Sequence, residues 1–105
     1  MRRYILIDHR PILCPDPIRW AKWYESAIKL RQVAYTEVWR GIHVSTVFLG
    51  LDYSRAPGEE PILFQTMIFG GLHEGYQRRC STWEQAEKQH RFAVDIAGQK
   101  KRRGA

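Results

Sequence analysis

The sequence has few cysteines and no long apolar run. Its 105 residues include two cysteines, Cys14 and Cys80, and neither belongs to a C-x-x-C pair or to a Cys/His cluster with zinc spacing. This pattern favours two reduced thiols over a disulfide. No apolar run approaches the roughly 18 residues that span a bilayer, and charges interrupt the N-terminal stretch where a signal peptide would be apolar. We therefore expect a cytoplasmic protein without a membrane partner.

The body of the chain has no net charge, although the whole sequence carries a formal charge of +6. Six of the 17 Lys and Arg residues lie near the ends, at Arg2, Arg3 and in the run 100–103. The eleven that remain are balanced by the 11 Asp and Glu residues. A folded nucleic-acid reader usually carries its basic residues on the body. The distribution therefore favours a solvated, flexible basic tail over residues 100–105.

The length allows one domain with one core, which we assign to residues 1–99. Asp16 and Pro17 fit the start of a helix, Ser81 and Glu84 match a capping box before a second helix, and Gly98 is placed to end it. Hydrophobic periodicity predicts the elements in this order: a strand over 4–7, a helix from 17, strands over 32–39, 42–51, 61–69 and 75–80, and a helix from 81.

This order, β-α-β-β-β-β-α, predicts an α+β fold with a largely antiparallel sheet of four to five strands and both helices packed on one face. The segments 42–51 and 61–69 are apolar on both faces, so we place them in the middle of the sheet. Two helices cover only one face, and an open apolar face usually marks a partner surface. We predict a homodimer or protein-binding face formed by Val47, Leu49, Leu63, Met67 and Phe69.

Several blocks of the sequence resemble a known family when they are taken together. These blocks are YILIDHRPI, WAKWYE, STVFLGLDYS, PILFQTMIFGG, EGYQRR and STWEQAEKQH, which together span roughly residues 4 to 92. In this order they are similar to a family of small conserved proteins of tailed bacteriophages and prophages. The chain departs from that pattern at Gln65, where the family tends to have an acid, and at Cys80, where it tends to have an aromatic residue.

The resemblance implies a modest function, because no activity is attached to the members of that family. It implies a small accessory protein in the cytoplasm of the bacterial host, which acts by binding a host protein or a defence component. We expect no catalysis and no cofactor. If the family's acid were catalytic, Gln65 would put that chemistry in doubt for this chain.

The segment 71–79 is the best candidate for a ligand site. An arginine fork beside an aromatic ring suits a phosphate, a nucleotide or an acidic protein surface. If the segment is a strand, Arg78 and Arg79 point to opposite faces, so one of them lies on the sheet near His73 and Tyr76. Together with Arg55 and the basic tail, these residues define the alternative function of nucleotide or nucleic-acid binding. The competing interpretation is an edge strand charged against aggregation.

Asp52 lies where the second long strand ends. A carboxylate there can act as a base or bind a metal, which gives a third hypothesis, a small metal-dependent hydrolase that uses Asp52 and His43. Capping of a turn by the carboxylate is the simpler interpretation, and no motif supplies enough ligands for a metal, so we expect none. His90 falls in the apolar stripe of the second helix, where we expect a core histidine that is hydrogen-bonded to a strand.

Overall fold

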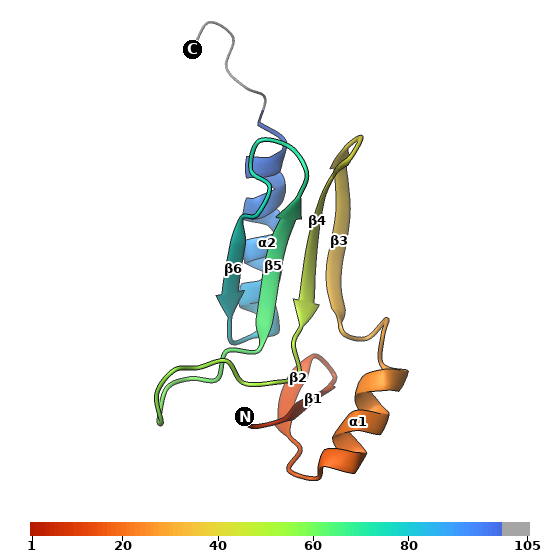
Figure 1. The fold of residues 1–105 in the computed structure, drawn as a ribbon, viewed down its shortest axis with the longest axis vertical. Coiled ribbons are helices and arrows are strands. Elements are labelled where there is room, and N and C mark those ends of the chain that lie inside the picture. The colour runs from red at the N-terminus through yellow and green to blue at the C-terminus, as the bar shows by residue number, and fades with distance from the viewer. Residues whose placement is uncertain (100–105) are drawn as a thin grey trace, which may run out of the picture.

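The computed structural model describes residues 1–99, and the predicted basic tail, residues 100–105, lies outside the described residues. Figure 1 shows a four-stranded sheet with one long helix against it, and a smaller hairpin and helix at one end of that sheet. The elements in chain order are β1 (Tyr4–Ile7), β2 (Arg10–Leu13), α1 (Pro17–Ser26), β3 (Gln32–Trp39), β4 (Ile42–Phe48), β5 (Phe64–Phe69), β6 (Gln77–Cys80) and α2 (Trp83–Ala97).

The α+β class and the order of the predicted elements are confirmed. The four-stranded sheet is antiparallel throughout and has the strand order β3-β4-β5-β6. Its two central strands are β4 and β5, as their two apolar faces predicted. The last strand, β6, lies at an edge, as predicted from its polar sequence.

Strand β2 was not predicted. It pairs with β1 in a separate two-stranded sheet, and the turn between them places Asp8 at φ 50° and His9 at φ 67°. Glycine usually occupies the second of these left-handed positions, so residues 8 and 9 do not carry the usual signature of a hairpin turn. The ring of His9 stacks on Trp83 with a centroid distance of 3.7 Å, and this contact ties the hairpin to the start of α2.

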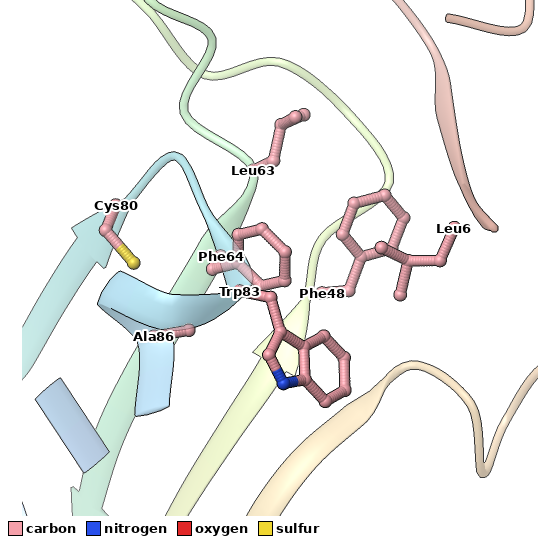
Figure 2. Close-up of a cluster of buried hydrophobic side chains, with 7 residues drawn as sticks. All are labelled: Leu6, Phe48, Leu63, Phe64, Cys80, Trp83 and Ala86. Atoms are coloured by element: carbon pink, nitrogen blue, oxygen red, sulfur yellow. The ribbon is translucent and has the colours of Figure 1, made fainter. Parts of the chain in front are cut away.

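Helix α2 covers one face of the four-stranded sheet, where it contacts all four strands. Its start lies one residue later than predicted, because the capping box pairs Thr82 with Gln85 and not Ser81 with Glu84. Gly98 caps its C-terminus, as predicted. Two buried side chains of its first turns and five from the rest of the chain form the core cluster in Figure 2: Leu6, Phe48, Leu63, Phe64, Cys80, Trp83 and Ala86.

Helix α1 lies at the end of the sheet and packs against β1. Asp16 accepts hydrogen bonds from the first free N–H groups of this helix, as predicted. The indole of Trp20 donates to the carbonyl oxygens of Tyr4 and Gly50 at 3.0 and 3.1 Å, and Trp23 meets Phe48 edge to face. The extra hairpin explains this position, because α1 packs against its first strand, β1.

The arrangement of layers leaves one face of the four-stranded sheet open. The molecule measures 55 × 30 × 19 Å, and its short dimension matches one sheet and one layer of helix. Within residues 1–99, no helix has the length and apolar character needed to cross a membrane.

Candidate functional site

The open face of the four-stranded sheet is the side of β3 to β6 opposite α2, and we take it as the candidate site. Along β4, the side chains that point toward α2 are fully buried, as at Val44, Thr46 and Phe48. The residues between them, Ser45 and Val47, keep part of their surface exposed. Because successive side chains of a strand point to opposite faces, this alternation separates the covered face from the open one.

Three rings form a row across one end of the open face. His43 of β4 lies between Tyr35 of β3 and Phe69 of β5, with centroid distances of 5.3 and 5.0 Å. Its ring stacks on Phe69 and is tilted by 33° against Tyr35. Tyr35 is 54% exposed and Phe69 is 38% exposed, although both are large side chains in regular strands. Water therefore reaches an aromatic surface that spans three strands.

Two charged residues lie at the two edges of this face. Glu37 of β3 pairs with His43 in the ladder and is exposed. Arg79 of β6 pairs with Gln65, and its Nε donates to Gln65 Oε1 at 2.9 Å. Its guanidinium carbon lies 4.8 Å from the centre of the Tyr53 ring, which fits a cation–π contact.

The five residues predicted for the partner face divide into three groups. Val47, Met67 and Phe69 lie on the open face with their surfaces partly accessible. Leu49 follows the end of β4 and is half-buried. Leu63 was placed wrongly, because its side chain is 1% exposed and belongs to the core cluster. Strand β5 begins only at Phe64, so the alternation predicted from residue 61 does not apply to Leu63.

Arg78 and Arg79 extend to opposite faces, as predicted, since they pair with the inward Thr66 and the outward Gln65. Arg78 lines a cavity of about 230 Å³ at the α2 side of β6, together with Tyr76, Lys88, Gln89 and Phe92. The hydroxyl of Tyr76 is buried and has no hydrogen-bond partner in the structure.

The remaining residues of the predicted ligand site are separated from one another. Tyr76 packs against the second core cluster, built on Val44 and Ile68, and His73 has its Nε2 buried without a partner. Arg55 lies exposed in the loop after β4. The structure therefore brings Tyr76 and Arg78 to one cavity but leaves Arg55 and Arg79 on other surfaces.

Asp52 fixes the backbone of the loop between β4 and β5. Its Oδ1 accepts hydrogen bonds from the backbone N–H groups of Ser54 and Ile62, at 2.8 and 3.0 Å. Burial of this carboxyl opposes ionisation, but these hydrogen bonds and the charge of Arg2 lower its pKa. Asp52 also lines an open cavity of about 600 Å³ with Arg2 and Arg55.

The hydrolase hypothesis requires Asp52 and His43 to act together, but they lie at opposite ends of β4. His43 is the second residue of β4 and Asp52 follows its end, and the five residue steps from His43 to Phe48 alone amount to roughly 17 Å. Residues 1–99 contain no group of three His, Cys, Asp or Glu side chains that could hold a metal ion. The arrangement gives Asp52 the turn-capping role that was the alternative interpretation.

His90 forms the centre of a buried hydrogen-bond network under α2, and the prediction of a core histidine bonded to a strand is confirmed. Its Nε2 lies 2.9 Å from Thr36 Oγ1 and its Nδ1 lies 2.8 Å from Thr46 Oγ1. Thr46 Oγ1 in turn lies 2.7 Å from Thr66 Oγ1. Burial lowers the pKa of His90, so the ring is neutral in the folded protein near pH 7.

Both cysteines are free, as predicted, and both are buried. Burial raises the pKa of the Cys80 thiol to about 11, which leaves very little nucleophilic thiolate at neutral pH.

Part of the aromatic row was not predicted from the sequence. Tyr35 was predicted only to lie in the strand over 32–39, and its contact with His43 depends on a cross-strand register that a single strand pattern does not fix.

No family model matches the chain, and no curated protein or solved structure shows significant similarity to it.

Proposed function

We propose that this protein is a non-catalytic, phage-type accessory protein that acts by binding, and that it does so as a homodimer joined through the open face. One observation carries this proposal: a row of three adjacent rings, Tyr35, His43 and Phe69, lies uncovered on a sheet whose other face is covered by α2. Burial of such rings supplies much of the stability of protein interfaces.

A second copy of the chain is the occupant that suits this face. The face carries an acidic residue, Glu37, at one edge and a basic residue, Arg79, at the other, so it offers both charges to an identical surface. A twofold dimer places the same patch on both sides of the interface, and a patch of mixed charge around an apolar centre is complementary to itself.

The phage-type assignment rests on the sequence blocks that resemble phage and prophage proteins. With it we propose the cytoplasm of the bacterial host as the place of action. The dimer would bind a host protein or a defence component there and act in stoichiometric amounts, without turnover. The structural uses of Asp52 and His90 support a non-catalytic role, because both side chains already serve the backbone or the core.

Sedimentation velocity of two matched variants tests the homodimer. Phe69→Glu places a carboxylate in the aromatic row, whereas Phe92→Glu makes the same change on α2, on the other side of the sheet, where Phe92 is 57% exposed. We expect wild type and Phe92→Glu to dimerise at micromolar concentration and Phe69→Glu to sediment as a folded monomer. A wild-type protein that stays monomeric throughout this range would refute the proposal.

Nucleotide or nucleic-acid binding is a second candidate, favoured by the cavity between β6 and α2. Two cationic side chains, Arg78 and Lys88, line this cavity beside the exposed ring of Phe92, and cations next to an aromatic ring suit a phosphate and a base. A labelled single-stranded oligonucleotide and ATP are the probes. Binding that weakens steeply with salt and is lost in Arg78→Glu supports this function, and no binding of either probe at low salt removes it.

A further inference from the structure

The strand register places Glu37 and Arg79 at diagonally opposite corners of the open face. Glu37 lies on edge strand β3 in the row of His43 and Phe69. Arg79 lies on the other edge strand, β6, in the row of Gln65. The two corners are therefore separated by three strand spacings across the sheet and by four residues along β5, from Phe69 to Gln65.

These two separations are nearly equal. Three strand spacings amount to about 14 Å and four residues along a strand to about 14 Å. The line from Glu37 to Arg79 thus runs at about 45° to the strands. In a twofold dimer with facing sheets, the axis lies in the interface and passes through the centre of the face. Glu37 of one copy then faces Arg79 of the other only if the axis runs at right angles to the line that joins these two residues.

Such an axis also lies at about 45° to the strands, so the strands of the two copies cross at about 90°. This is one of the two packing angles that face-to-face sheets adopt, the other being the aligned arrangement near −30°. The other diagonal axis also gives crossed strands, but it sets Glu37 against Glu37 and Arg79 against Arg79. A twofold axis that runs parallel or perpendicular to the strands does not bring Glu37 opposite the Arg79 of the other copy.

We propose that the two copies pack with their strands crossed at about 90°, so that Glu37 of each subunit lies beside the partner's Arg79. This inference rests on the proposed homodimer and adds its orientation. Electrostatic complementarity fixes the register of an interface and excludes the arrangements that bring like charges together. The hydrogen bond to Gln65 uses only Arg79 Nε, and a guanidinium carries further N–H donors for a carboxylate.

The middle row supplies the apolar contact at the centre of this dimer. Ser45 and Met67 pair between the two central strands, halfway between the rows of Glu37 and Arg79. Each therefore lies next to the axis, where Met67 meets the partner's Met67. A flexible thioether side chain fits this position, because it adapts to irregular gaps.

Charge reversal at the two corners tests the orientation. We expect Glu37→Arg alone and Arg79→Glu alone each to raise the dimer dissociation constant about tenfold at low salt, because each sets like charges together twice in the dimer. The double variant, Glu37→Arg with Arg79→Glu, restores both pairs with the charges exchanged. Its dissociation constant should return to within about threefold of the wild-type value.

Matched reversals elsewhere control for net charge. Glu84→Arg and Arg91→Glu make the same changes on exposed positions of α2 and should leave dimerisation unchanged. The orientation is overturned if neither single reversal weakens the dimer, or if the double variant is weaker than both. The homodimer itself fails by a different result, a wild-type protein that does not dimerise, so the two failures can be told apart.

Discussion

The two faces of the four-stranded sheet carry different kinds of side chain, although the same strands form both faces. On the covered face, Thr46 and Thr66 are completely buried, and their hydroxyls are satisfied by each other and by His90. On the open face, Tyr35 and Phe69 leave their rings accessible to water. The covered face thus buries two hydroxyls among its apolar side chains, whereas the open face leaves aromatic rings exposed. A polar group can be buried where all of its hydrogen-bonding capacity is satisfied. An exposed row of aromatic rings, in contrast, indicates a surface that a partner covers.

The largest contrast is expected from truncating one phenylalanine on each face. Phe64→Ala removes a ring that is 0% exposed in the core cluster and should cost about 3 to 5 kcal/mol of unfolding free energy. Phe69→Ala removes a ring that is 38% exposed on the open face and should cost the monomer only about 1 to 2 kcal/mol. Urea denaturation at a concentration too low for dimers measures both. Equal losses would mean that the open face is covered within one chain.

A smaller contrast is expected from removing one hydroxyl on each face. Thr46→Val deprives His90 Nδ1 of its partner and should cost about 1 to 3 kcal/mol, the usual penalty for an unsatisfied buried group. Ser45→Ala, one residue earlier and on the open face, should change stability by less than about 0.5 kcal/mol. Thermal and urea unfolding of the pair give the comparison, and a neutral Thr46→Val would show that the network contributes little.

Low pH should lower the free energy of unfolding through protonation of His90 on the covered face. The pKa of His90 is lowered in the folded protein, so the unfolded chain takes up a proton first as the pH falls below about 6.5. The contribution is complete above that pH and is lost progressively as the pH falls toward the lowered folded value. Unfolding free energies measured between pH 7.5 and pH 5 should show this loss in wild type and a smaller one in His90→Gln. An unchanged loss in His90→Gln would assign it to other groups.

The smallest effect is expected from deleting residues 100–105. If the open face holds the dimer together, the truncated chain should dimerise with a dissociation constant within about twofold of the full chain, at low and at high salt. The same truncation should reduce the affinity for an oligonucleotide and its salt dependence if the second candidate function is correct. Analytical ultracentrifugation and a binding titration separate these outcomes.

Periodicity and caps were enough to predict most of the fold. Asp16 and Gly98 marked helix ends correctly, and the apolar pattern of β4 and β5 placed both strands in the centre of the sheet. The hairpin formed by β1 and β2 was missed because Asp8 and His9 adopt left-handed backbone angles without a glycine. The stacking of His9 on Trp83 that accompanies this turn joins residues far apart in the sequence.

The sequence was enough to predict which face of the sheet forms the candidate site, but not which side chains meet on that face. Val47, Met67 and Phe69 followed from alternation along single strands. The contact of Tyr35 with His43, and the diagonal from Glu37 to Arg79, depend on how strands are registered against one another. A shift of one residue would move each of these side chains to the other face. Strand patterns therefore indicate which residues share a face, and the register decides which of them meet.

Sedimentation equilibrium of the unmodified chain across the micromolar range tests the central claim most directly. The account predicts a mass that rises with concentration from 12.4 kDa toward twice that value, as a second copy covers the open face. A mass that stays at 12.4 kDa at every concentration, with Tyr35 and Phe69 still accessible to solvent, would contradict it.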